Sequence, residues 1–131
     1  MREILFRAKR EDNGVWVESD SIMQFDCDVF DDEYKNGGIK LWDKDGWVWV
    51  DKDTFGEFTG LMDKNGKRIF EGDILKTSNK NEPIWYVDYK LCSFCVNQRN
   101  VNYSCRLDEF EIETDLEVIG NIYDKPELLE A

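Results

Sequence analysis

Hydrophobic and polar residues alternate over much of the chain, and turn residues separate the alternating runs. Near the N-terminus, "REILFRAK" places Ile4, Phe6 and Ala8 on one side of a strand, and "VWVES" returns after Asn13-Gly14. A period of two is typical of β-strands, and Asn-Gly is a strong signal for the tight turn of a hairpin. The sequence therefore predicts an N-terminal β-hairpin.

Two more hairpins are expected from the same pattern. In "IKLWDKDGWVWVDKD" the turn is placed at Asp45-Gly46, between two strands that carry three tryptophans. In "FTGLMDKNGKRIF" the turn is Asn65-Gly66, which is expected to supply the two positive-φ positions of a type I′ turn. The acidic segment 26–33 has apolar spacers without a clear period and is interpreted as a loop.

The C-terminal half reads as further short strands. "EGD" turns the chain, and "IWYVDY", "FCVNQ", "EFEIE" and "LEVIGNIYD" follow, each with β-branched or aromatic residues. Only the tail "KPELLEA", with Pro126 near its start, predicts a helical turn. The fold class expected is mainly β, with a small barrel starting near the Gly-Asp corner.

Composition and charge limit the classes of function that this chain can have. The chain has 131 residues and a net charge of -12, which repels phosphate backbones, so no direct binding of nucleic acid is expected. No apolar run approaches the roughly 20 residues that cross a bilayer, and the N-terminus lacks the features of a signal peptide. We therefore expect a cytoplasmic protein that does not associate with membranes.

Several chemistries are disfavoured by residue content. The chain has no histidine, which excludes Ser-His and Cys-His nucleophile pairs and histidine-ligated zinc catalysis. Cys92 and Cys95 have the spacing of a zinc or redox pair, but Cys27 and Cys105 stand alone. We expect reduced thiols, no cofactor and no metal. The "DKDG" and "DKNG" segments lack the glycine and glutamate positions of a calcium loop and are interpreted as turns.

Three blocks of the sequence resemble the YopX family of small proteins encoded by bacteriophages and prophages: "MREILFRAK", "FTGLMDKNGKRIFEGDIL" and "EVIGNIYDKPELL". Residues 78–106 and the acidic segment match nothing in particular. The resemblance implies a C-terminal SH3-like β-barrel, which we place over residues 56–131. The hairpins predicted from the alternation above place an N-terminal β-hairpin region over residues 1–55. It also implies a phage or prophage origin, and it supplies no catalytic residues.

Two groups of residues are candidate binding sites. The tryptophans of the second hairpin could act as aromatic anchors of an interface: Trp42, Trp47 and Trp49. Polar residues of the central block could line a shared surface, although exposed hairpins are usually just solvated. They are Thr59, Asp63, Lys67, Arg68, Glu71 and Asp73.

The favoured hypothesis is a non-enzymatic accessory module that binds a host or phage protein. Because strand edges and tryptophans need cover, we also expect a homo-oligomer. The alternative is an acidic decoy that imitates DNA and occupies a host nucleic-acid-binding protein. Its carboxylates would be Asp108, Glu109, Glu111, Glu113, Asp115 and Glu117, some of which alternate with Phe110 and Ile112 as on the wet face of a strand. An enzyme using carboxylates and a divalent cation is a weaker third hypothesis.

Overall fold

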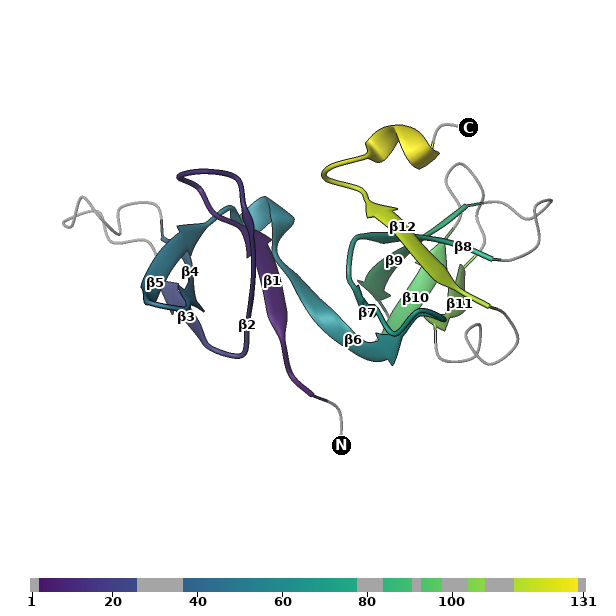
Figure 1. The fold of residues 1–131 in the computed structure, drawn as a ribbon, viewed down its shortest axis with the longest axis horizontal. Coiled ribbons are helices and arrows are strands. Elements are labelled where there is room, and N and C mark those ends of the chain that lie inside the picture. Colours follow the sequence, from purple (N-terminus) through teal and green to yellow (C-terminus); the bar gives the residue numbers. More distant parts are fainter. Residues whose placement is uncertain are drawn as a thin grey trace. The chain divides into compact units, whose positions relative to one another are not determined.

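The computed structural model of the protein describes residues 3–25, 37–77, 84–90, 93–97, 104–107 and 115–129. The described chain is mainly β, as predicted, and it forms two compact units, residues 1–57 and 58–131 (Figure 1). The acidic segment 26–33, interpreted from the sequence as a loop, lies outside the described residues.

The first unit begins with the predicted hairpin. Strand β1 (Phe6–Lys9) pairs antiparallel with β2 (Trp16–Ser19), and the turn between them contains Gly14 at a φ of +72°. The Asn13 side chain accepts the backbone N–H of Val15 at 2.9 Å and so stabilises the turn. The N-terminal hairpin is therefore confirmed.

A three-stranded antiparallel sheet follows, in the order β3-β4-β5. Its strands are β3 (Ile22–Phe25), β4 (Gly38–Asp43) and β5 (Gly46–Val50). The second hairpin is confirmed, but its turn is Lys44-Asp45 and not Asp45-Gly46, because Gly46 already pairs with Asp43 in the ladder. Lys44 takes the positive φ of this turn, at 49°.

The core of the first unit lies between the two groups of strands. Its fully buried side chains come from β1, β2, β4 and β5: Ala8, Val17, Leu41 and Val50. The short 3-10 helix η1 (Lys52–Thr54) covers one end, where the Thr54 hydroxyl accepts the backbone N–H of Lys9 at 2.9 Å. This packing leaves the other face of the three-stranded sheet turned away from the core.

The second unit is built on a five-stranded antiparallel sheet in the order β11-β10-β9-β8-β12. Its strands are β8 (Asp73–Lys76), β9 (Trp85–Lys90), β10 (Ser93–Asn97), β11 (Ser104–Arg106) and β12 (Glu117–Asn121). Strand β6 (Gly56–Met62) pairs with β1 at its start and with β7 (Arg68–Phe70) further on. The 3-10 helix η2 (Pro126–Leu129) is the helical turn that the tail predicted.

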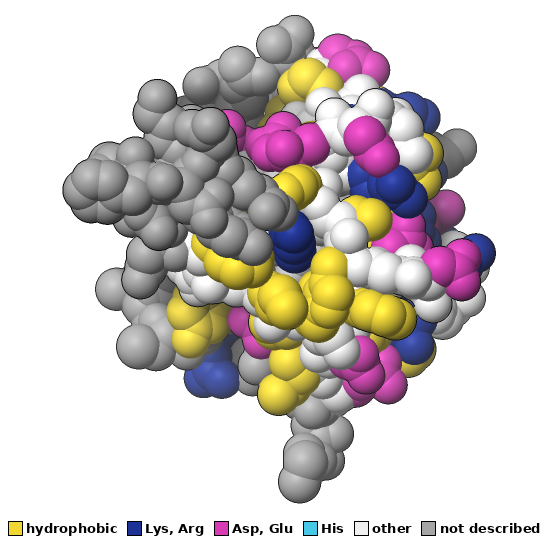
Figure 2. Space-filling model, turned by 90° about the vertical axis from the view of Figure 1, so that its left-hand side faces the viewer, with side chains coloured by type: hydrophobic (Ala, Val, Ile, Leu, Met, Phe, Trp, Pro, Cys, Tyr) yellow, Lys and Arg dark blue, Asp and Glu magenta, His cyan; other side chains and the backbone are white. Residues whose placement is uncertain are grey.

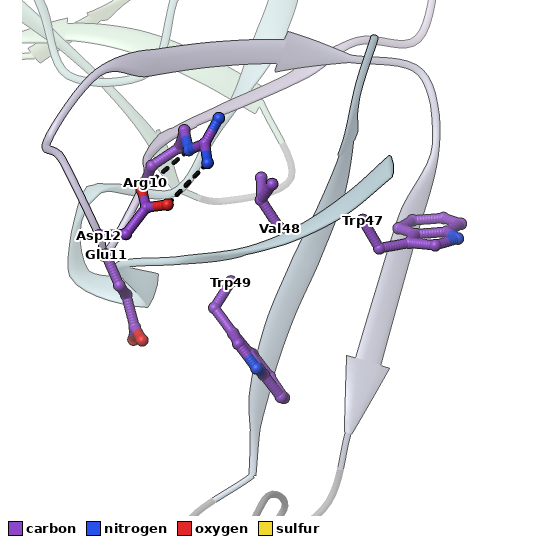
Figure 3. A pocket seen from close by; sticks show the side chains of 6 residues that line it. All are labelled: Arg10, Glu11, Asp12, Trp47, Val48 and Trp49. Atoms are coloured by element: carbon purple, nitrogen blue, oxygen red, sulfur yellow. Dashed lines mark hydrogen bonds and ion pairs between the residues drawn. The ribbon is translucent and has the colours of Figure 1, made fainter. Parts of the chain in front are cut away.

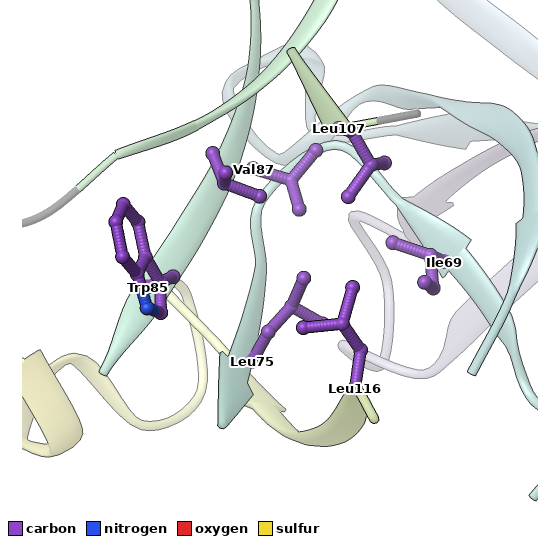
Figure 4. Close-up of a cluster of buried hydrophobic side chains, with 7 residues drawn as sticks. Ile69, Leu75, Trp85, Val87, Leu107 and Leu116 are labelled. Carbon is purple, nitrogen blue, oxygen red and sulfur yellow. The ribbon is translucent and has the colours of Figure 1, made fainter. Parts of the chain in front are cut away.

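The core of the second unit gathers side chains from several strands and from the segments beside them. Figure 4 shows them pointing toward one another. They are Ile69, Leu75, Trp85, Val87, Val96, Leu107 and Leu116. Burying each such side chain contributes roughly 1.5–3 kcal/mol relative to leaving it in water, so this cluster is a main source of stability for the unit.

The turn of the third hairpin differs from the prediction. Gly66 has a φ of +79° but Asn65 has no positive φ, so the predicted type I′ turn is wrong. The Asp63 carboxylate accepts the backbone N–H groups of Asn65 at 2.8 Å and Lys67 at 2.9 Å. These bonds hold a three-residue loop in which Gly66, the last residue, takes the left-handed backbone.

Candidate binding surface

The face of the three-stranded sheet that points away from the core carries the predicted tryptophan cluster. Lys40 is the cross-strand neighbour of Trp49, and Trp42 is the neighbour of Trp47. The intervening Leu41 is fully buried on the opposite face. Because successive side chains of a strand alternate between faces, all four cross-strand neighbours share the outer face.

Trp42 and Trp47 form an exposed aromatic pair. Their ring centroids lie 5.6 Å apart, with the planes at 80° in an edge-to-face arrangement. Their exposed fractions are 43% and 37%, and Met23, on the neighbouring strand of the same face, is 38% exposed. Large apolar side chains that gather on a surface in this way mark sites of interaction more often than lone ones do.

The third tryptophan of the cluster holds a cation. The Lys40 ammonium lies 4.5 Å from the centroid of the Trp49 ring and 5.6 Å from that of Phe25. The Phe25 and Trp49 rings are themselves 5.4 Å apart. Cation–π contacts of this kind fix the lysine stem over the aromatic rings and place one positive charge within an apolar surface.

Figure 2 looks from the side where Figure 1 draws β3, β4 and β5. Hydrophobic side chains gather there in a band, a basic side chain lies within it, and acidic side chains lie around it. We call the residues Met23, Phe25, Lys40, Trp42, Trp47 and Trp49 the aromatic face. An apolar centre with a charged margin is the usual anatomy of a protein interface.

A hollow of about 550 Å³ lies beside this sheet, between the β1–β2 turn and β5 (Figure 3). The residues that line it are Arg10, Glu11 and Asp12 from the turn and Trp47, Val48 and Trp49 from β5. Its volume lies within the roughly 300–1,000 Å³ of typical ligand pockets. The two tryptophans belong to both the hollow and the aromatic face.

An ion-pair network fixes one wall of the hollow. The Arg10 guanidinium donates to both Asp12 carboxylate oxygens, at 2.9 and 2.6 Å, and to the Asp43 carboxylate at 3.0 Å. The hydrogen bond from Arg10 holds the pKa of Asp12 below its usual range, and the same bond raises the pKa of Arg10. The Asp12 and Asp43 carboxylates therefore share one guanidinium, and the exposed Glu11 adds a third carboxylate to the lining, so these four side chains together are negatively charged.

The polar residues of the central block do not all face solvent. Asp63 and Asp73 are 7% and 1% exposed, and each carboxylate accepts backbone N–H groups, with Phe70 donating to Asp73 at 2.8 Å. Lys67 and Arg68 are exposed, and the Arg68 guanidinium lies 5.9 Å from the Phe58 ring centroid. The two buried carboxylates thus stabilise turns of the fold.

Other predicted residues have these positions. Thr59 is buried and donates its hydroxyl to the Ile69 carbonyl at 2.7 Å, and Glu71 is half-buried. The Cys95 side chain is buried, whereas Cys92 lies outside the described residues. Among the residues that the structure describes, no three acidic or cysteine side chains gather in a metal-binding group.

The acidic run proposed for the decoy falls largely outside the described residues, which omit 108–114. Of its two described members, Asp115 is exposed. Glu117 pairs with Lys76 across β12 and β8, with nitrogen and oxygen 3.5 Å apart.

Sequence reasoning missed several residues of the surface. Strand β3 was not predicted, so Met23 and Phe25 were absent from the candidates, although "IMQF" has strand-forming residues. Lys40 could have been found from its alternation with Trp42 in "KLW". The position of Glu11 beside β5 depends on how the hairpin packs, and no local pattern indicates it.

These features define a small all-β protein of two units with an exposed aromatic face. The chain matches the YopX protein family over residues 5–130 and belongs to that family. It is similar in fold to the crystal structure of protein EF1440 from Enterococcus faecalis, with 24% identity and a TM-score of 0.55, over 98% of this chain and 99% of that one. No curated protein matches the sequence.

None of the helices among the described residues is both long enough and apolar enough to cross a bilayer.

Proposed function

We propose that this protein is a cytoplasmic, non-enzymatic accessory module, encoded by a phage or prophage, that binds a host or phage protein. The observation that carries this proposal is the exposed edge-to-face pair of Trp42 and Trp47. Tryptophan is among the residues most enriched at interface hot spots, where a few buried aromatic anchors supply most of the binding energy. The family match supports the proposed origin.

The surroundings of the pair support the same conclusion. Met23 extends the apolar surface along the sheet, and the Lys40 stem covers Trp49. A strand face held by a packed core is rigid, so these side chains lose little conformational freedom when a partner covers them. This lowers the cost of binding.

The proposal is tested by capturing partners with the tagged protein in cells that produce it naturally. The test variant is Trp42→Ala with Trp47→Ala. The matched control is Tyr89→Ala, because Tyr89 is 52% exposed and forms its own edge-to-face pair with Phe94, at 5.0 Å and 69°, in the second unit.

We expect the wild type and the control to capture the same partner and the double variant to lose it, while circular dichroism and melting temperature show that all three fold. Retention of the partner by the folded double variant would overturn the proposal. Loss of the partner by both the double variant and the control would show that the interface is not specific to the tryptophan pair, and would also overturn the proposal.

The acidic decoy is the second proposal, and the net charge of -12 supports it. The two are separated by adding DNA and salt to the captured complex. DNA displaces a DNA mimic from its partner, and the affinity of that complex falls steeply with salt. The affinity of an interface built on aromatic anchors changes little with either addition. Displacement by DNA would favour the decoy.

We further propose that the second unit closes into an SH3-like barrel. Core side chains from β7, β8, β9 and β10 point into one cluster, which is how a small barrel fills its interior. Nuclear Overhauser contacts between backbone amides that connect the strands into a ring would support closure. A ladder with two open edges would exclude it.

A further inference from the structure

We infer that the hollow beside β5 binds an extended, arginine-bearing segment of the partner protein, which adds a short antiparallel strand to β5 at Trp47. This rests on the proposed function, because it specifies the chemistry of the partner. The argument depends on three features: an open strand edge, an aromatic wall and a surplus of negative charge.

The outer edge of β5 is occupied along only part of its length. The Trp49 carbonyl accepts the backbone N–H of Glu11 at 3.1 Å, and the next contact with the β1–β2 turn is the bridge between Arg10 and Val50. Within a strand, the N–H and C=O of a residue point to the same edge, and successive residues alternate. Trp47 therefore points its N–H and C=O to the same edge as Trp49.

The hydrogen bonding of β4 leads to the same orientation of the Trp47 backbone groups. The Trp42 backbone N–H donates to the Ser21 carbonyl at 3.3 Å, toward β3, so its cross-strand neighbour Trp47 is not bonded to it and faces away from β4. No described residue is hydrogen-bonded to the backbone of Trp47 on this edge. An open edge of this kind is a template for an added strand.

The hollow begins at this open edge. Trp47, Val48 and Trp49 form one side of it, and the exposed Glu11 forms part of the other. In Figure 3 the Glu11 carboxylate, from the β1–β2 turn, and the Trp49 indole, from β5, extend in the same direction, whereas the Trp47 indole points elsewhere. A side chain of an added segment that enters beside Trp49 therefore meets an aromatic ring and a carboxylate.

Arginine fits this combination best. Its planar guanidinium stacks on a tryptophan ring and pairs with a carboxylate at the same time, and the Glu11 carboxylate offsets the positive charge of the Lys40 ammonium that already lies over Trp49. Asp12 and Asp43 already form ion pairs with the Arg10 guanidinium. Glu11 is therefore the carboxylate lining the hollow that can pair with an incoming cation. A second copy of this chain would instead bring another acidic surface, because each copy carries a net charge of -12.

The test uses an acetylated and amidated seven-residue peptide in which arginine alternates with threonine. One control peptide replaces every arginine with glutamate. Two further control peptides keep the sequence but carry backbone N-methyl groups, one at all its arginines and the other at all its threonines. Because successive residues point their N–H groups to alternate edges, each of these peptides lacks the hydrogen-bond donors of one edge. Binding is measured by titration while the backbone amide of Trp47 is followed by ¹⁵N nuclear magnetic resonance and hydrogen exchange.

We expect the arginine peptide to bind and to protect the Trp47 amide from exchange. The glutamate peptide should not bind, and one of the two N-methylated peptides should bind while the other does not. Equal binding of both N-methylated peptides, or no protection of Trp47, would overturn the added strand. No binding of the arginine peptide would overturn the whole inference.

Two charge-reversal variants test whether the arginine of the peptide binds beside Glu11. Glu11→Lys should weaken binding of the arginine peptide by about tenfold. The substitution replaces the attraction between a carboxylate and a guanidinium with repulsion between two cations. Glu127→Lys is the matched control: Glu127 is exposed in the second unit and the substitution changes the net charge equally. Equal weakening by both variants would show a general charge effect and contradict the assignment of Glu11.

The peptide experiment can fail independently of the proposed function. If the arginine peptide does not bind, yet loss of Trp42 and Trp47 still abolishes partner capture, the inference is wrong and the proposed function stands. If Glu11→Lys alters self-association and no peptide binds, a second copy occupies the hollow, which also overturns the inference.

Discussion

The backbone N–H of Val118 donates a hydrogen bond to the Asp63 carboxylate at 3.0 Å, across 55 residues of sequence. The neighbouring Lys64 N–H donates to the Leu116 carbonyl at 2.9 Å. The turn of the third hairpin and the start of β12 are therefore held together by one buried carboxylate and one backbone bond. Asp63 thus stabilises a local turn and a long-range contact at once.

Removal of the Asp63 carboxylate should destabilise the protein strongly. Asp63→Ala leaves the backbone N–H groups of Asn65, Lys67 and Val118 without their acceptor, and we expect a loss of about 1–3 kcal/mol in the free energy of unfolding. Urea titration measures it. Asp115→Ala, at an exposed aspartate, is the control and should change stability little. Equal effects of the two would contradict the role of Asp63.

Stability should also depend on pH through Asp63. Burial disfavours the charged carboxylate, but the N–H groups of Val118, Lys67 and Asn65 outweigh it, so the pKa of Asp63 lies below its usual range. A lowered pKa contributes stability above the unfolded pKa and loses it as pH falls through the folded value.

The advantage of the wild type over Asp63→Asn should therefore shrink as the pH falls below about 4. Urea titrations of both proteins across this range measure it. A constant difference between them would show that ionisation of Asp63 does not contribute.

Gly66 should tolerate valine poorly. Its φ of +79° is a left-handed conformation that a β-branched residue resists, at a cost of roughly 1–2 kcal/mol. Gly46 is the matched control: open space also surrounds the position of its added Cβ, but its φ is not positive. We expect Gly66→Val to lower the melting temperature and Gly46→Val to leave it nearly unchanged. Similar melting temperatures would mean that the turn is wrongly assigned.

Self-association is predicted to strengthen with salt. The exposed tryptophan pair favours contact between copies, whereas the net charge of -12 opposes it over distances that salt screens within about 10 Å at 0.1 M ionic strength. Light scattering at tens of micromolar, at low and high salt, measures this. A monomer under both conditions would exclude the prediction.

The sequence predicted local structure better than long-range structure. Alternation and turn residues located the first two hairpins, because a half-buried strand must present its apolar side chains at every second position. The turn at Asn65-Gly66 was assigned the wrong type because the Asp63 side chain bonds to two backbone N–H groups and holds the loop in another conformation. Local propensity does not include such a side-chain acceptor.

The candidate site was predicted in part. Trp42, Trp47 and Trp49 were recognised because aromatic residues that alternate along a hairpin share a face. Asp63 and Asp73 were grouped with surface residues, because burial by folding is not visible in a charged local pattern. Glu11 was missed since its contact with β5 arises from the packing of one hairpin on another sheet.

The central claim, that partners bind at the aromatic face, is tested most directly by site-specific photo-crosslinking. The photoreactive residue p-benzoylphenylalanine replaces Trp42 in one protein and Tyr89, an exposed aromatic of the second unit, in another. We expect a discrete covalent complex with one partner protein from position 42 and none from position 89, after irradiation of cells that produce the protein naturally. A complex from position 89 with none from position 42 would contradict the account.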